Sequence, residues 1–120
     1  MHMTKKPNEL LGIARFKIHE GKLPEFKRLS EECMRIAREK DTGTLQYDIF
    51  VNDEKSEAIV IERYKDSAAL MEHLANNAHV AKDIFATGSV EGELLGEPNA
   101  ELKAMLSSSP VSLFTHFLSL

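Results

Sequence analysis

The sequence predicts one α+β domain in which helices lie on one face of an antiparallel sheet. A chain of 120 residues has the size of a single domain. Segments with the two-residue alternation of strands are interspersed with segments whose apolar residues recur every three or four positions, as in helices. Short polar turns separate the segments, so strands that follow each other directly are expected to pair as hairpins.

The first strand is expected at residues 10–19, where Phe16 and its alternate neighbours share one face. A helix follows at residues 24–40 and begins at Pro24, which suits a first helical turn because proline lacks an N–H group. Its apolar residues recur at helical spacing: Phe26, Leu29, Cys33, Ile36 and Ala37.

Two strands joined by a polar turn are expected at residues 44–52 and 57–64. Asp66 is a suitable N-cap for a second helix at residues 67–77. The stripe of that helix expected to be buried consists of Leu70, Met71, Leu74 and Ala78. The remaining elements are expected to be a helix at 79–86, a strand at 89–95, a helix at 100–106 and a strand at 111–120.

The order strand, helix, strand, strand, helix, strand is that of a ferredoxin-like fold with right-handed crossovers. Its helices cover only one face of the sheet, yet the third strand carries Ile59, Val60 and Ile61 in succession and is therefore apolar on both faces. Because burial of a large apolar side chain is worth about 1.5–3 kcal/mol, we expect a second copy of the chain to cover the other face. The sequence thus predicts a homodimer with a barrel-like centre.

Three parts of the chain are expected on this basis. Residues 1–9 form a flexible tail, residues 10–98 form the ferredoxin-like domain, and residues 99–120 form a C-terminal helix–strand extension at the dimer interface. The last strand is expected to pair with an edge of its own sheet or of the partner's sheet.

Composition excludes several classes of function. The net charge is −4 and acids are interleaved with bases, which argues against binding of nucleic acid. No run of 18 apolar residues is present, and the N-terminus lacks the apolar segment of a secretory signal, so we expect a cytoplasmic protein that does not enter a membrane. The single cysteine, Cys33, is expected to be a buried packing residue.

Several polar and aromatic residues are candidates for a site. His73 is placed at the margin of the buried stripe of its helix, either as a general base in a pocket or as a half-buried histidine bonded to a backbone carbonyl. Asn77 either binds a substrate carbonyl or caps the helix end. His79 begins the next helix and joins His73 only if the chain kinks between them.

The strands add four further candidates. Tyr47 and Tyr64 either line a cavity with a polar tip or pack in the core. Glu62 stands in an otherwise apolar strand, as a site carboxylate or as the partner of an arginine such as Arg15 or Arg63. Phe16 is expected to supply apolar contact to a bound molecule. No metal-ligand spacing, phosphate-binding loop or nucleophile elbow appears, so neither a metal nor a cofactor is expected.

The chain resembles the antibiotic biosynthesis monooxygenase family from about Leu11 to Gly88. The resemblance depends on three groups of residues: Gly21 with Phe26; Gly43-Thr44-Leu45-Gln46-Tyr47; and Ile61-Glu62-Arg63-Tyr64-Lys65-Asp66-Ser67-Ala68-Ala69-Leu70 with His73 and His79. Two positions depart from the family pattern, because Asp41-Thr42 stands where Glu-Pro is common and Tyr64 stands where Trp is common.

The resemblance implies a dimeric α+β barrel and a small-molecule substrate. It implies cofactor-independent insertion of oxygen into an aromatic, quinol or polyketide-like compound in a cavity between sheet and helices. His73 would be the base, Asn77 and Tyr47 would orient the substrate, and the remaining candidates would line the cavity. The alternatives are an isomerase of a small keto or phosphorylated metabolite, which needs a cationic pocket, and a ligand-binding module without turnover.

Overall fold

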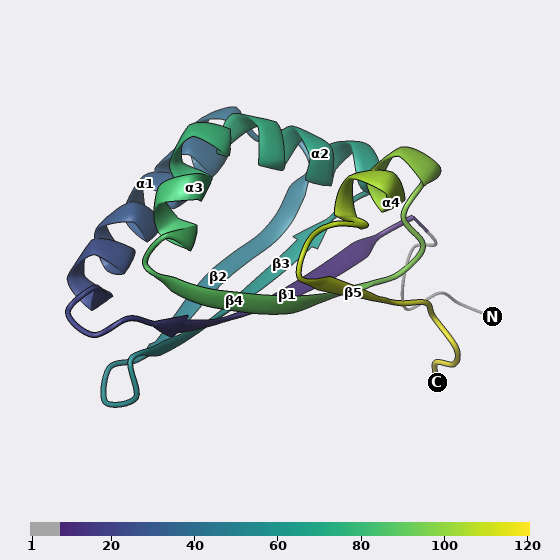
Figure 1. Cartoon of the computed structure of the whole chain (residues 1–120). Coiled ribbons are helices and arrows are strands. Elements are labelled where there is room, and N and C mark those ends of the chain that lie inside the picture. The colour runs from purple at the N-terminus through teal and green to yellow at the C-terminus, as the bar shows by residue number, and fades with distance from the viewer. Residues whose placement is uncertain (1–7) are drawn as a thin grey trace.

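The computed structural model describes residues 8–120, so most of the predicted N-terminal tail lies outside the described part of the chain. Its elements follow the predicted order (Figure 1). They are β1 (Leu10–Ile18), α1 (Leu23–Lys40), β2 (Thr44–Asn52), β3 (Glu57–Tyr64), α2 (Ser67–Asn76), α3 (Ala78–Phe85), β4 (Gly88–Leu95), α4 (Ala100–Leu106) and β5 (Val111–Phe114).

The strands form one sheet in the order β2-β3-β1-β4-β5. Neighbouring strands among the first four are antiparallel, as predicted for a ferredoxin-like fold. β5 joins the edge of its own sheet and runs parallel to β4, because α4 carries the chain back across the sheet between them. The predicted last strand was too long, since it ends at Phe114 and residues 115–120 do not continue it.

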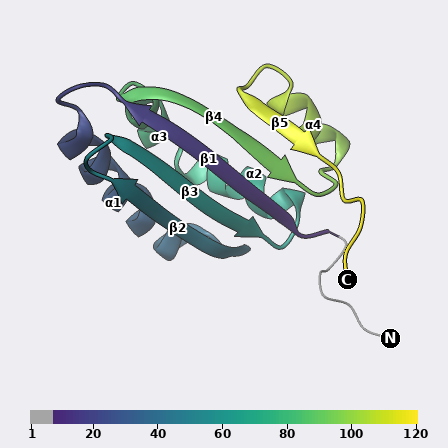
Figure 2. The same ribbon diagram turned by 90° about the horizontal axis from the view of Figure 1, so that it is seen from below.

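All helices of residues 8–120 lie on one side of the sheet, as Figure 1 shows, and the view from below in Figure 2 shows the opposite side without a helical layer. We call the helix side the inner face and the opposite side the outer face. The outer face carries Phe50 and Ile59, which are 58% and 42% exposed. Phe50 pairs with Ile59, and Ile61 pairs with Ile13, so these four side chains form an apolar patch.

The core lies between the inner face and the helices. The predicted apolar residues of α1 are buried, and they pack with Phe16, Ala58 and Val60 of the sheet in one cluster. A second cluster brings Leu10 and Tyr64 together with Leu102 of α4. The C-terminal extension therefore packs into the core of its own chain.

The predicted buried stripe of α2 is wrong in part. Leu74 is 38% exposed and Ala78 is exposed, whereas His73 and Asn77 are each only 5% exposed. The helix begins where predicted, because the Asp66 side chain accepts a hydrogen bond from the backbone N–H of Ala69 at 2.9 Å. Leu70 is buried and Met71 is half-buried as predicted, so the error is confined to the end of the helix, where His73 and Asn77 turn inward.

α4 is held to the rest of the fold at its first residue and along its buried side. The Asn99 side chain accepts from the backbone N–H of Leu102 at 2.9 Å, and the backbone N–H of Asn99 donates to Ser67 Oγ at 2.9 Å. Leu102 has no exposed surface, whereas Met105 on the same helix is 49% exposed.

We expect Leu102→Ala to lower the free energy of unfolding by about 2–5 kcal/mol, because it leaves a cavity in a packed cluster. Met105→Ala on the exposed side of α4 should change it by less than about 0.5 kcal/mol. Urea denaturation of both variants measures the difference. Equal and small effects would mean that the extension does not contribute to the core.

Candidate functional site

A cavity of about 600 Å³ lies between the inner face of the sheet and the helices. Its floor is made by small residues of the two central strands, Gly12, Ala14 and Gly92. A Cβ atom added at Gly12 would come no closer than 3.9 Å to Glu62 Cβ and Leu94 Cδ1, so a methyl group would fit there in ordinary van der Waals contact. Small residues at these positions leave room above the sheet that larger side chains would fill in a packed core.

The cavity brings together most of the predicted site residues. It is lined by Phe16, Tyr47, Glu62, Tyr64, His73 and Asn77. His79 is exposed and does not line it, so the break between α2 and α3 does not turn this histidine toward His73.

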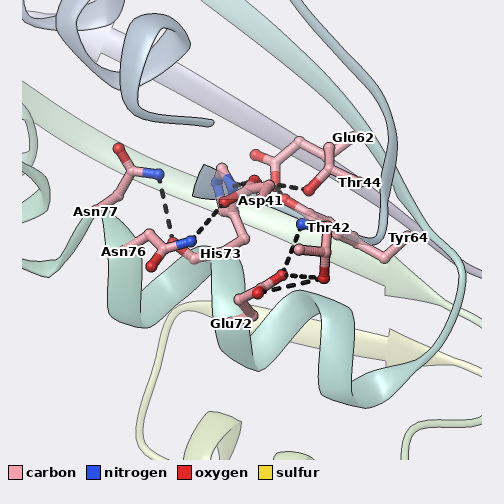
Figure 3. A network of polar contacts seen from close by, with 9 residues as sticks. All are labelled: Asp41, Thr42, Thr44, Glu62, Tyr64, Glu72, His73, Asn76 and Asn77. Atoms are coloured by element: carbon pink, nitrogen blue, oxygen red, sulfur yellow. Dashed lines mark hydrogen bonds and ion pairs between the residues drawn. The ribbon is translucent and has the colours of Figure 1, made fainter. Parts of the chain in front are cut away.

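A buried His–Asp pair lies at one side of the cavity (Figure 3). His73 Nδ1 lies 2.7 Å from Asp41 Oδ2, and the two side chains are only 7% and 2% exposed. Asp41 follows the last residue of α1, and its carboxylate also accepts from Asn76 Nδ2 at 2.9 Å and from Thr44 Oγ1 at 2.7 Å. His73 is therefore bonded to a carboxylate and not to the backbone carbonyl that was the alternative.

The environment of Asp41 fixes the tautomer of His73. Burial alone would raise the pKa of Asp41, but hydrogen bonds from Asn76, Thr44 and His73 outweigh it and lower the pKa below its ordinary value. An ionised carboxylate only accepts hydrogen bonds, so Nδ1 of His73 donates to it. Nε2 then carries the free lone pair, and it has no hydrogen-bond partner within residues 8–120. A histidine arranged in this way can accept a proton from a bound molecule.

Glu62 lies near this pair but has the opposite electrostatic character. Burial raises its pKa, and a hydrogen bond donated by the Tyr64 hydroxyl only partly offsets this. The predicted arginine partners are wrong: Arg15 pairs with Glu93, and Arg63 pairs with Glu9. The pKa values of two neighbouring carboxyl groups are thus driven apart, which leaves Asp41 ionised and favours the protonated form of Glu62.

This raised pKa predicts a loss of stability with rising pH. The native state retains the Glu62 proton to higher pH than the unfolded chain, whose glutamate pKa is about 4.3. Between these two pKa values the native state binds more protons, so the free energy of unfolding falls as pH rises. Glu62→Gln removes this dependence, so the free energy of unfolding should fall less from pH 4 upward than in the wild type. Urea denaturation at successive pH values measures it, and equal slopes would contradict the raised pKa.

Two tyrosine rings enclose His73. The ring centroid of Tyr47 lies 5.1 Å from that of His73 in an edge-on arrangement, and that of Tyr64 lies 5.4 Å away. Burial, followed by the charge of Glu62, raises the pKa of both hydroxyl groups, so both stay protonated at neutral pH. The Tyr47 hydroxyl is thereby available as a hydrogen-bond donor beside the base.

Two buried acceptors in the cavity wall have no hydrogen-bond partner within residues 8–120. They are Asn77 Oδ1 and Ser30 Oγ. Asn77 is oriented by its own amide nitrogen, which donates to the backbone carbonyl of His73 at 3.3 Å. Buried polar atoms are normally bonded, so these two are suited to an N–H or O–H group of a bound molecule.

Two features of the cavity were not predicted: the place of Ser30 in its wall and the pairing of Asp41 with His73. The signal for Ser30 was a polar residue in the buried stripe of α1.

Among residues 8–120, no three His, Cys, Asp or Glu side chains come together as a metal-binding group. Of the helices in this part of the chain, none combines the length and apolar character needed to cross a bilayer.

Comparison with known proteins agrees with this architecture. The profile of the family described as Antibiotic biosynthesis monooxygenase matches residues 11–81. No curated protein sequence matches the chain. MupZ from Pseudomonas fluorescens has a similar fold, with a TM-score of 0.83 and 22% sequence identity over 94% of this chain and 93% of its own.

Two shorter proteins share the fold as well. SnoaB from Streptomyces nogalater, described as a cofactor-independent oxygenase, is 19% identical with a TM-score of 0.65 over 78% of this chain and 96% of its own. Rv0793 from Mycobacterium tuberculosis is 21% identical with a TM-score of 0.65 over 76% of this chain and 96% of its own. Since the family profile spans more than half of the sequence, the chain belongs to the antibiotic biosynthesis monooxygenase family.

Proposed function

We propose that the protein is a cofactor-independent monooxygenase that acts on an electron-rich hydroxylated aromatic or quinol-like molecule. The observation that carries this proposal is the His73–Asp41 pair, whose histidine borders a cavity with mostly apolar walls. Membership of the family supports a monooxygenase-type role, and SnoaB, a protein of similar fold, is described as an oxygenase without cofactor.

The first step is removal of a proton from the substrate by Nε2 of His73. Asp41 holds the ring in the productive tautomer and stabilises the imidazolium that forms. The Tyr47 hydroxyl borders the cavity beside His73 and donates a hydrogen bond to the substrate oxygen on which negative charge develops. Glu62 lines the same cavity, and burial raises its pKa, which favours a proton that it can donate to the same oxygen. Asn77 and Ser30 accept from a second polar group of the substrate and fix its orientation.

The deprotonated substrate is itself the reductant of O2. It transfers an electron to O2, and recombination forms a carbon–oxygen bond to a peroxide on the ring carbon. Cleavage of the O–O bond leaves one oxygen atom on that carbon, while the other takes up two hydrogens lost by the substrate and leaves as water. An apolar cavity excludes bulk water from the carbanion during this sequence.

The rival functions make different demands on the cavity. An isomerase of a phosphorylated metabolite needs a cation for the phosphate, and no lysine or arginine of residues 8–120 lines this cavity. A ligand-binding module without turnover needs no base, yet the cavity holds one with an oriented partner. These contrasts favour the oxygenase.

The experiment is oxygen uptake by the metal-chelated, flavin-free protein with hydroxylated anthrones and alkylhydroquinones. We expect one O2 consumed per quinone formed, at a rate well above that of the uncatalysed reaction, with no accumulation of hydrogen peroxide. Binding of these compounds without any increase in oxygen uptake would overturn the oxygenase and favour the ligand-binding module.

A further inference from the structure

The cavity extends beyond the His73–Asp41 pair to the C-terminal extension. Four residues of the extension line it, from the end of α4 to the start of β5: Leu106, Ser109, Pro110 and Val111. We define these four residues as the far wall.

Strand register measures how far the far wall lies from the base. Tyr47 pairs with Glu62, Glu62 with Gly12, Gly12 with Leu94, and Leu94 with Leu113, so one row of residues crosses all five strands. Neighbouring strands lie about 4.8 Å apart, so the row spans roughly 19 Å. The polar groups occupy its β2–β3 end, and the far wall occupies the β5 end.

The floor between the two ends is made of glycine and apolar residues. Gly12 lies in the middle of the row and Gly92 lies beside it, and both are on the floor of the cavity. Leu94 and Val90 add apolar surface next to them. Glu91 and Glu93 alternate with Gly92 along β4 and point to the outer face, where Glu93 pairs with Arg15, so they bring no charge into the cavity. An anionic chain would lose its hydration there without a compensating cation.

We propose that the substrate is elongated, with its reactive ring at His73 and an uncharged apolar chain that lies over Gly12 and ends against the far wall. Leu106 sets the length of chain that fits. The identity of the reactive ring rests on the proposed function, whereas the chain is inferred from the cavity alone.

The test is calorimetric titration of the full chain with 4-alkylphenols from ethyl to octyl. Burial of each methylene should tighten binding about fourfold, until the chain reaches the far wall and the gain stops. Leu106→Ala should move this limit to longer chains, and Leu106→Trp should move it to shorter ones. Met105→Ala, on the exposed side of the same helix, should match the wild type.

A merely structural role of Leu106 would weaken all phenols equally, so an unchanged chain-length limit in both Leu106 variants would overturn the proposal. No binding by any phenol, or equally tight binding by a phenol whose chain ends in a carboxylate, would also overturn it. If neither Leu106 variant folds, Val111→Ala tests the same wall. It should also move the chain-length limit to longer chains. The titration measures binding and does not require turnover. A chain-length limit without oxygen uptake would therefore support this inference and overturn only the oxygenase.

Discussion

His73→Gln should lower kcat for the accepted substrate by about 10²–10⁴-fold. General base catalysis typically contributes this much, and glutamine has no group that accepts a proton near neutral pH. Steady-state oxygen uptake at saturating substrate measures the loss. KM should change far less, because the apolar walls that bind the substrate remain in place.

Two variants isolate the cause of that loss. Asp41→Asn should lower kcat by a similar factor, because the asparagine amide donates to Nδ1 and moves the imidazole proton to Nε2, which removes the base. His79→Gln removes an exposed histidine that does not line the cavity, and it should leave kcat unchanged. Wild-type turnover by His73→Gln, or an equal loss in His79→Gln, would exclude His73 as the base.

Ile59→Asp should weaken self-association by about 10²–10⁴-fold. We propose that the outer face packs against a second copy of the chain, since Phe50 and Ile59 are exposed there without a helical layer. Loss of Ile59 burial costs about 1.5–3 kcal/mol in each subunit, and the loss counts twice in a symmetric dimer. Sedimentation equilibrium over a range of concentrations measures the dissociation constant.

Met105→Asp is the matched control, because Met105 is similarly exposed but lies on α4 above the inner face. It should leave the dissociation constant unchanged. A wild-type protein that stays monomeric at tens of micromolar would contradict the dimer altogether, and with it the reason given for the apolar outer face.

Local patterns predicted most of the fold. The stripe from Phe26 to Ala37 in α1 and the cap at Asp66 depend on neighbours within one or two turns, so the sequence alone reveals them. The sequence did not decide whether β5 pairs with its own sheet or with the partner's sheet. Its pairing with β4 depends on packing of α4 against residues far away in the chain.

The site was predicted less completely, for a physical reason. His73, Asn77 and Tyr47 line the cavity, as predicted from their residue types and places in the chain, but the partner of His73 is Asp41, which lies 32 residues away at the end of another helix. Hydrophobicity placed Leu74 in the buried stripe, although Leu74 is 38% exposed and the end of α2 turns His73 and Asn77 inward instead. The Tyr64 partner of Glu62 was predictable in principle, since residues two apart share one face of a strand.

The most direct test of His73 as the base is hydrogen exchange without oxygen. In deuterated buffer under anaerobic conditions, nuclear magnetic resonance follows the acidic ring hydrogen of a bound hydroxyanthrone while the oxidation step is blocked. We predict that the wild type accelerates exchange of this hydrogen and that His73→Gln does not. Equal exchange rates in the two proteins, alongside normal aerobic turnover by the wild type, would contradict the account.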